Sequence, residues 1–380
     1  METVTAPMNE ALEQVRELAH QFAAAELRPH VERWDHERRL DTSVLPQLAE
    51  LGFFGMLGPE SHGGLDFDLP TYLAVLEELA WGEPAVALTL SIHSAFGIRP
   101  LLRHGTAAQQ ERWLRPLATG QLLACFALSE PGAGSDAAAV ETTARRAGDG
   151  WVIDGQKKWV TNGAIAGLAV VIARTAEAPG PRSLAAFLVP TEAEGVEVGA
   201  RESTMGLRAS EVVSLHLHGV HLGADALLGA ADRGFHLAME GLDLGRLGVA
   251  AQAIGIARAA LEHALAYAAE REQFGQPIRE FEAIQFKLAD MATRTEAAQA
   301  LLRRAAQAPS TRLAAMAKLF ASECATEVTR QAVQVFGGYG YMRDYPVEKL
   351  MRDAKATEIY EGTSEIQRVV IARALFGRPA

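Results

Sequence analysis

Two carboxylates lie four residues apart in the segment IYEGTSEIQR, which covers residues 359–368. Its SEIQ run, 364–367, matches a capping box, so we expect a helix to begin at Glu365, whose negative charge would complement the helix dipole. Glu361 precedes that helix, in a loop beside a glycine. Proton transfer is the chemistry open to such a carboxylate, but a solvated loop residue is the simpler interpretation of this segment alone.

A glycine-rich run, GAGSDA at residues 132–137, matches the pattern G-x-G-x-x-A of dinucleotide-binding turns. That pattern needs a strand, a helix and a second parallel strand, with an acidic residue about 20 positions on. Asp154 is suitably distant, but it lies in a tight turn between strand-like segments, which argues against a Rossmann fold. The loop could still bring backbone N–H groups close to a phosphate or a flat polar ring, although a surface turn is simpler.

Two residue pairs could also contact a ligand. Trp159 and Thr161 lie on one face of an expected strand and offer an aromatic plate and a hydroxyl, with core packing as the alternative for Trp159. Asp243 and Arg246, three residues apart at the start of an expected helix, point the same way, although a surface ion pair would do so too. The two cysteines are far apart and form no C-x-x-C pair, so neither a disulfide framework nor a metal site is indicated.

The spacing of apolar residues and the placement of turn signals divide the chain into three domains that must position these residues. Apolar residues at helical spacing predict an α-helical domain over 1–121. Short runs bounded by turn signals, including Asp149-Gly150 and Asp154-Gly155, predict an antiparallel β domain over 122–233. Helical segments return over 234–380, so the protein is expected to be mainly α with a central β domain.

Composition narrows the class of protein. The chain has 380 residues, 49% of them hydrophobic, and a net charge of −11, which suits a globular core and argues against attraction to nucleic acid or anionic membrane. The apolar runs 84–98 and 247–257 fall short of the about 20 residues that span a bilayer, so we expect buried helices and no membrane insertion.

Gly248 and Gly255 would let a neighbouring helix approach closely. The N-terminal segment has no apolar signal core and no arginine-rich leader, which predicts a cytoplasmic protein.

Six segments together resemble the acyl-CoA dehydrogenase family, in its order and over nearly the whole chain. They are CFALSEPGAGSD (125–136), KKWVTNG (157–163), MGLRAS (205–210), REQFGQPIREFEAIQFKLADM (271–291), QVFGGYGY (334–341) and IYEGTSEIQR (359–368). The stretch from Leu242 to residue 291 is most similar to the short-chain and branched short-chain members. The resemblance implies an N-terminal helical domain, a middle β domain, a C-terminal four-helix bundle, one non-covalent FAD per subunit and a homotetramer arranged as a dimer of dimers.

The resemblance also implies the cofactor contacts. The flavin and its pyrophosphate would be met by Phe126, Leu128, Ser129, Gly134 and Ser135, and the isoalloxazine ring would be flanked by Trp159 and by Thr161, the latter near N5. The FAD of a neighbouring subunit would be reached by Arg271, Gln273, Phe274, Gln334, Gly337 and Gly338. Glu282 stands where the family usually has glutamine, so a carboxylate there would accept from ribose hydroxyls but repel phosphate. Thr363 and Glu365 would touch the phosphate and ribose region.

On the substrate side, the resemblance implies an acyl-CoA path lined by Ser135, Asp243, Arg246 and Gly362, with Glu361 as catalytic base. A glutamate with an ordinary pKa of about 4.3 is too weak a base for a C–H bond unless burial raises its pKa. In the family mechanism, a flavin ribose hydroxyl and the N–H of Glu361 polarise the thioester carbonyl, and hydride moves to flavin N5. Gly245 cannot supply the base that some relatives carry just before the arginine.

The expected reaction is α,β-dehydrogenation of short- to medium-chain acyl-CoA, straight or branched, to trans-2-enoyl-CoA, with electrons passed to an electron-transfer flavoprotein. Glutaryl-type members carry an extra arginine near the position of Ala87, so a dicarboxylic substrate is not expected here. Two alternatives stay open. One is an oxidase or monooxygenase of the same fold that uses O₂, and the other is a catalytically silent acyl-CoA-binding protein.

Overall fold

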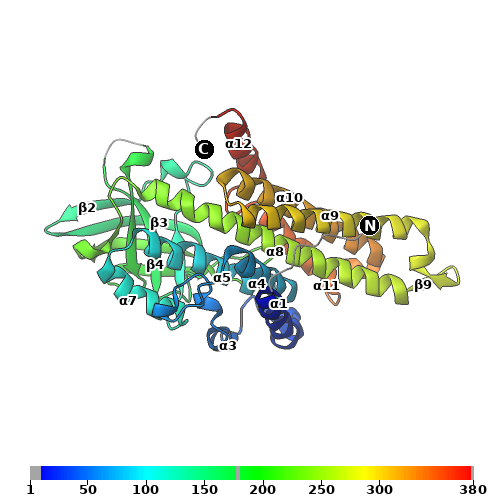
Figure 1. Cartoon of the computed structure of the whole chain (residues 1–380). Coiled ribbons are helices and arrows are strands. Elements are labelled where there is room, and N and C mark those ends of the chain that lie inside the picture. Colours follow the sequence, from blue (N-terminus) through cyan, green and yellow to red (C-terminus); the bar gives the residue numbers. More distant parts are fainter. Residues whose placement is uncertain (1–9, 177–179, 378–380) are drawn as a thin grey trace.

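The computed structural model of the protein describes residues 10–176 and 180–377 (Figure 1). Helices, then a β-sheet, then long helices follow one another along the chain, which confirms the expected fold class. The sheet lies at one end of the molecule and the long C-terminal helices extend away from it.

The N-terminal helices are α1 (Glu10–Phe22), α2 (Val31–Glu37), α3 (Val44–Glu50), α4 (Leu69–Gly82), α5 (Pro84–Ile92), α6 (Arg99–His104) and α7 (Ala107–Ala118). A carboxylate caps the start of each of the helices α4 and α5. Asp68 caps α4 by accepting from Thr71 N, and Glu83 caps α5 by accepting from Ala85 N. A π-helical turn, His93–Ile98, joins α5 to α6, so Pro84–His104 is continuously helical.

The strands of the middle domain are β1 (Ala124–Ala127), β2 (Thr143–Ala147), β3 (Gly150–Thr161), β4 (Leu168–Arg174), β5 (Leu184–Pro190), β6 (Val196–Arg201), β7 (Val212–Leu222) and β8 (Leu227–Leu228). They form one sheet in the order β6-β7-β3-β2-β4-β5-β8, mainly antiparallel, with β1 paired in parallel to β4. No helix of βαβ type follows the glycine-rich loop in this described stretch; a short turn, Ala137–Ala139, leads into β2. The match to a dinucleotide fingerprint is therefore coincidental.

The prediction of a turn at Asp154-Gly155 was wrong. Asp154-Gly155 does not end a strand, because β3 continues through it with a register shift between Ile153 and Gly155. Gly155 has φ +153°, and a Cβ there would lie 2.4 Å from Thr142 Oγ1, so glycine permits a bulge rather than a turn. The true hairpin between β2 and β3 turns at Gly148 and Asp149.

The C-terminal helices are α8 (Gly234–Glu270), α9 (Glu282–Gln307), α10 (Thr311–Phe336), α11 (Pro346–Thr357) and α12 (Ser364–Leu375), with a hairpin of β9 (Glu272–Gln273) and β10 (Gln276–Pro277) after α8. Helix α8 packs against α9, α10, α11 and α4. The expected close approach is confirmed, since a Cβ at Gly248 would lie 2.1 Å from Ser91 Oγ and one at Gly255 would lie 2.4 Å from Glu77 O. The central helix is thus held between the N-terminal helices and the bundle.

Two helical stretches, Pro84–His104 and α8, are long and apolar enough to cross a membrane, contrary to the expectation drawn from the shorter apolar runs. In each, 89% of the apolar window is buried inside the protein. Burial of both runs as core helices is confirmed.

Candidate functional site

Glu361 lies in the loop that joins α11 to α12. Ser364 N donates to Glu358 O at 2.9 Å, which closes this loop on itself. Glu361 has φ +55° and Gly362 has φ +86°, so two successive residues adopt the left-handed conformation that is uncommon outside glycine. The loop therefore holds the Glu361 side chain in a direction that an extended segment would not give it.

The capping prediction was wrong by one residue. Helix α12 begins at Ser364, and the cap is Thr363, whose hydroxyl accepts from Ile366 N at 3.3 Å. The side-chain amide of Gln367 does not reach back to a cap N–H; it donates instead to the carbonyls of Glu361 at 3.1 Å and Gly362 at 2.8 Å. The left-handed turn leaves these two carbonyls without backbone donors, and the amide supplies one. Glu365 lies in the first turn, as expected.

The carboxylate of Glu361 is electrostatically unusual. Its Oε2 is buried and has no hydrogen-bond partner in the described ranges. Burial raises the pKa of Glu361 to about 7, against the lowering effects of Arg246 and Lys318. A carboxylate that exchanges its proton near neutral pH is suited to general base chemistry.

Helix α8 borders Glu361 through Gly245 and Arg246. A Cβ at Gly245 would lie only 2.6 Å from Glu361 Oε2, so glycine makes room for the carboxylate. Arg246 is buried, and its Nη1 donates to Asp243 Oδ1 at 2.5 Å, while Asp243 Oδ2 accepts from Thr311 Oγ1 at 2.5 Å. The Asp243–Arg246 pair is therefore not a surface ion pair, and the structure brings it together with Glu361.

An apolar cluster lies beside this loop. Phe126 of β1 and Tyr360 of the loop both pack against it, and its buried members are Leu88, Ile92, Ala95, Phe96 and Leu207. Phe126 stacks on Phe96 with ring centroids 4.0 Å apart. Leu207, in the MGLRAS segment, is tied down because its N–H donates to Asp353 Oδ1 at 2.6 Å. Hydrocarbon surface is thus concentrated next to the carboxylate.

The loop after β1 runs along β3. Ser129 O accepts from Lys158 N at 2.8 Å, and the fully buried Lys157 donates to Leu128 O at 3.0 Å and to Glu130 Oε1 at 2.6 Å. These bonds place Ser129 beside the residue that precedes Trp159. Farther along, Ser135 is exposed, and a Cβ at Gly134 would meet no atom within 4 Å.

Trp159 and Thr161 end β3 facing away from the buried Val160. Trp159 has φ +56° at a second register shift, between Lys157 and Val160, and its side chain is 56% exposed. It is therefore not a core residue. Beyond them, the buried Asn162 fixes the strand end by donating to the carbonyls of Thr89 at 3.0 Å and Ala124 at 3.2 Å.

These features fit a flavin. An exposed aromatic plate, an adjacent threonine hydroxyl and a glycine loop with open space above it are what a planar ring and its pyrophosphate require. Phe126, Leu128, Ser129, Gly134, Ser135, Trp159 and Thr161 lie on these connected segments. Their contacts with FAD stay predictions.

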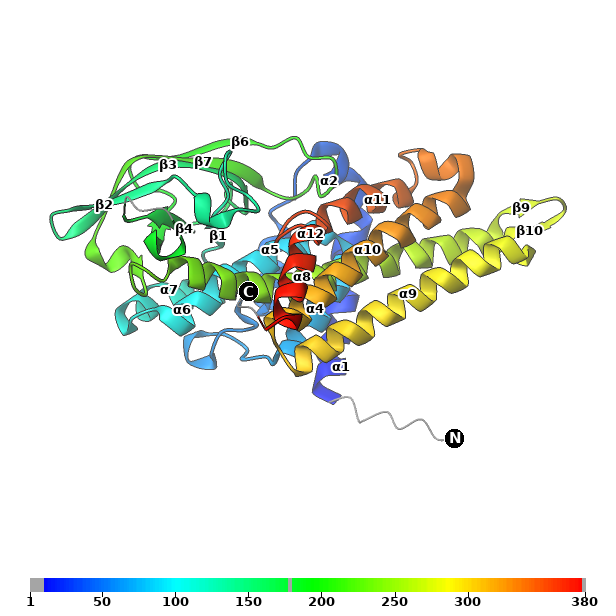
Figure 2. The same ribbon diagram turned by 90° about the horizontal axis from the view of Figure 1, so that it is seen from above.

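A second set of predicted cofactor residues lies elsewhere. Figure 2 shows β9 and β10 at the tip of the molecule, away from α12. Arg271, Gln273 and Phe274 belong to this tip, and the Arg271 guanidinium lies 5.4 Å from the Tyr339 ring centroid, beside the Gln334 to Gly338 segment that ends α10. Glu282 is exposed in the first turn of α9. One chain does not bring this set to Glu361.

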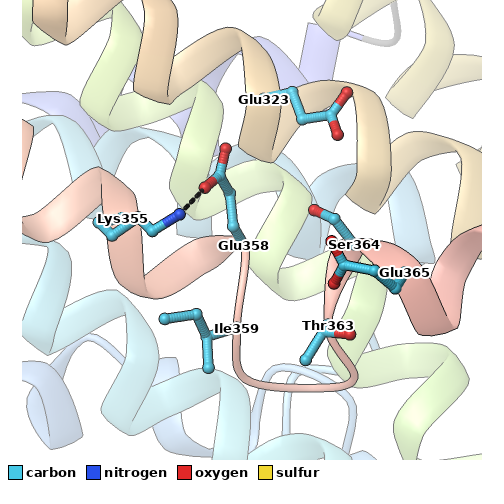
Figure 3. Close-up of a pocket in the computed structure, with 7 residues that line it drawn as sticks. All are labelled: Glu323, Lys355, Glu358, Ile359, Thr363, Ser364 and Glu365. Carbon is cyan, nitrogen blue, oxygen red and sulfur yellow. Dashed lines mark hydrogen bonds and ion pairs between the residues drawn. The ribbon is translucent and has the colours of Figure 1, made fainter.

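A pocket of about 160 Å³ lies at the start of α12 (Figure 3) and is lined by Glu323, Lys355, Glu358, Ile359, Thr363, Ser364 and Glu365. Its one lysine is already paired, because Lys355 Nζ donates to Glu358 Oε2 at 2.5 Å. Three carboxylates would repel a phosphate but can accept from hydroxyl groups. Of the predicted phosphate and ribose contacts of Thr363 and Glu365, the ribose contact suits this pocket.

Sequence reasoning missed Lys318, Gln367 and the Glu130–Lys157 pair. Lys318 and Lys157 are both fully buried, and each donates to a carbonyl of a predicted site loop. For Lys318, the available signal was its place within an apolar helical run, AAMAKLFA, since lysine is rarely buried without a partner.

Three family models match successive parts of the chain. They describe the N-terminal domain of acyl-CoA dehydrogenases over residues 9–121, the middle domain over 125–220 and the C-terminal domain over 232–376. The mitochondrial short-chain specific acyl-CoA dehydrogenase of Bos taurus is 44% identical over 368 residues, which cover 96% of this chain and 89% of that protein.

Solved structures are similar over the same length. Butyryl-CoA dehydrogenase from Megasphaera elsdenii superposes with a TM-score of 0.96 at 40% identity, covering 98% of this chain and 100% of that one. A chain solved in a study of the electron transferring flavoprotein of Acidaminococcus fermentans gives a TM-score of 0.96 at 41% identity, covering 98% and 99%.

Proposed function

The chain belongs to the acyl-CoA dehydrogenase family of FAD-dependent oxidoreductases, and we propose that it converts short- to medium-chain acyl-CoA to trans-2-enoyl-CoA with Glu361 as the base. The environment of Glu361 carries this proposal. Its buried, unpaired Oε2 and its pKa of about 7 make it a stronger base than an exposed glutamate. The adjoining apolar cluster offers hydrocarbon contacts for an acyl chain.

In the proposed reaction, Glu361 takes the proton from the α carbon of the thioester. Its own N–H donates to no acceptor in the described parts of the chain, so it is free to polarise the thioester carbonyl as negative charge develops there. Arg246 and Lys318 are positive charges near the carboxylate, and both restrain the rise of the pKa of Glu361. When bound, FAD supplies the acceptor for the hydride that leaves the β carbon.

The substrate preference is proposed from the same cluster. Ala87 is buried and carries no charge, so the chain offers no cation there for a second carboxylate. Large side chains, Leu88, Ile92 and Phe96, fill the region beside the loop. The similarity to proteins named short-chain and butyryl-CoA dehydrogenases supports a short monocarboxylic acyl group.

The electron partner and the assembly are proposed from one relative and from the exposed surface of the chain. The relative solved in a study of an electron transferring flavoprotein supports such a flavoprotein as the acceptor. A homotetramer is supported by the aromatic residues that one chain leaves bare at its tip, since Phe274 is 94% exposed and Tyr341 is 87% exposed. The cytoplasmic location stays a prediction.

Replacing the base tests the function. Glu361→Gln should retain FAD while bleaching of the flavin by butyryl-CoA under anaerobic conditions slows by at least about 10²-fold. Glu192→Gln replaces an exposed carboxylate of the β domain that lies outside the candidate site, and this control should bleach normally. Bleaching of Glu361→Gln at the wild-type rate would disprove the assignment of the base, and rapid turnover with O₂ in the wild type would favour the oxidase alternative.

A further inference from the structure

Helix α10 supports the Glu361 loop with two buried donors. Lys318 and Ser322 are fully buried and lie one helical turn apart. Lys318 Nζ donates to Gly362 O at 2.8 Å, and Ser322 Oγ donates to Thr357 O at 2.8 Å. The two residues therefore hold the segment at both of its ends.

The bond from Lys318 acts at the strained part of the loop. Glu361 has a left-handed backbone with φ +55°, a conformation that is unfavourable for a residue other than glycine. The Gly362 carbonyl receives both Lys318 Nζ and Gln367 Nε2, each at 2.8 Å. Two donors from different helices thus fix the carbonyl of Gly362, the residue that follows Glu361.

A lysine is a costly way to bind a carbonyl. Its ammonium group is desolvated, and burial lowers the pKa of Lys318 to about 8 although Glu361 raises it. A neutral amide, such as the one that Gln367 already provides, would bond the same oxygen. The positive charge of Lys318 therefore needs a separate explanation. The carboxylate that raises the pKa of Lys318 most is Glu361, whose Oε2 has no hydrogen-bond partner in the described ranges.

We propose that Lys318 is a positioning residue for Glu361, holding the left-handed turn through the Gly362 carbonyl and keeping the carboxylate ionised by its charge. The proposal rests on Glu361 being the base. Lys318 touches no reacting atom and acts through the loop and through the electric field.

Other charged and titratable groups lie near Glu361 and Lys318 and could also affect the ionisation of the base. Around Glu361 they are Arg246 of α8, Lys318 of α10, Tyr72 of α4 and Tyr360 of its own loop. Around Lys318 they are Glu361, Arg246, Glu358 and Glu365. Without Lys318, Arg246 would be the remaining cation that lowers the pKa of Glu361. That pKa would rise, and the base would stay protonated to a higher pH.

Three variants separate the hydrogen bond from the charge. Lys318→Met removes both at similar length, Lys318→Gln keeps a donor without the charge, and Ser322→Ala removes the other donor of α10. For each FAD-loaded variant, flavin content, Tm and the pH profile of kcat are measured. Exchange of α hydrogens in D₂O is followed with an acyl thioester that has sulfur at its β position and so has no β hydride to lose.

In Lys318→Met we expect kcat and α-hydrogen exchange to fall about 10²-fold and the acid limb of kcat to move up by about one pH unit. Lys318→Gln should recover most of kcat but keep the moved limb. Ser322→Ala removes no charge, so it should lower Tm and leave the acid limb at its wild-type pH. If Lys318→Met loses its flavin, Lys318→Gln decides the question by its acid limb.

An acid limb that stays at its wild-type pH in both lysine variants would overturn the proposal, whatever happens to Tm. Failure of the proposed function would look different. If Glu361→Gln kept normal α-hydrogen exchange, the base itself would be wrongly assigned. If Glu361→Gln were inactive but both lysine variants kept the wild-type acid limb, only the role of Lys318 would be disproved.

Discussion

The two ends of helix α10 meet very different surroundings. Near its start, Lys318 is fully buried beneath the Glu361 loop, and the carbonyls there are bonded within the chain. At its other end, Gly337 and Gly338 face open space, and neighbouring Tyr341 is largely exposed. The first end, where residues of the same chain surround Lys318 and the Glu361 loop, is called the finished end below. The second, where Gly337, Gly338 and the exposed Tyr341 lie, is called the uncovered end.

This difference shows which part of the candidate site one chain completes. The base and the face of the flavin can be assembled from a single chain, because Phe126 and Tyr360 share one apolar cluster. The hairpin with Phe274 lies at the opposite tip (Figure 1). The proposed tetramer would give that tip its function, by bringing it to the cofactor of another subunit.

The largest expected effect comes from disturbing the finished end. In Gly245→Ala the new methyl group would lie 2.6 Å from Glu361 Oε2 and force the carboxylate aside. We expect kcat to fall by about 10²-fold with FAD content and subunit mass unchanged. Steady-state kinetics and flavin absorbance measure this.

Gly338→Ala is the matched control, because no atom of the chain lies within 4 Å of its Cβ position. Its effect should be confined to FAD affinity. Equal loss of kcat in both variants, at saturating FAD, would show that the two ends do not differ as described.

Sequence reasoning captured the fold and the grouping of motifs better than the local geometry. Three domains and a close approach at Gly248 follow from periodicity and glycine placement, because these patterns depend on burial along one element. The bulge at Gly155 and the cap at Thr363 depend on which backbone groups lack partners once the chain is folded. The unpaired Oε2 of Glu361 could not be predicted either, since its neighbours come from α8 and α10.

The next effect should appear at the uncovered end. Phe274→Asp places a charge on a side chain that is 94% exposed, so the isolated subunit should keep its Tm. If the tip meets a second subunit, light scattering should show a smaller assembly, and FAD should dissociate more readily. Val198→Asp, on the exposed edge of β6 in the β domain, is the control and should keep the mass. A wild-type protein that is monomeric and retains FAD would refute this account of the tip.

The smallest effect sharpens the description of the finished end through the pH dependence of stability. The pKa of Glu361 rises from 4.5 in an exposed state to about 7 in the fold, so the folded protein binds the proton more tightly. Its stabilising contribution is complete below pH 4.5 and is lost as pH rises towards 7. That shift corresponds to about 3 kcal/mol, which the partial exposure of the loop reduces to about 1–2 kcal/mol.

Glu361→Gln cannot lose this contribution, so its stability relative to wild type should increase between pH 5 and pH 8 when unfolding by urea is followed by fluorescence. Groups that titrate equally in both proteins cancel in this difference. Glu365→Gln replaces an exposed carboxylate and should give a difference that changes little over the same range. A flat difference for Glu361→Gln would mean that its carboxylate is as well solvated in the fold as in the unfolded chain, and the contrast between the two ends of α10 would then rest on shape alone.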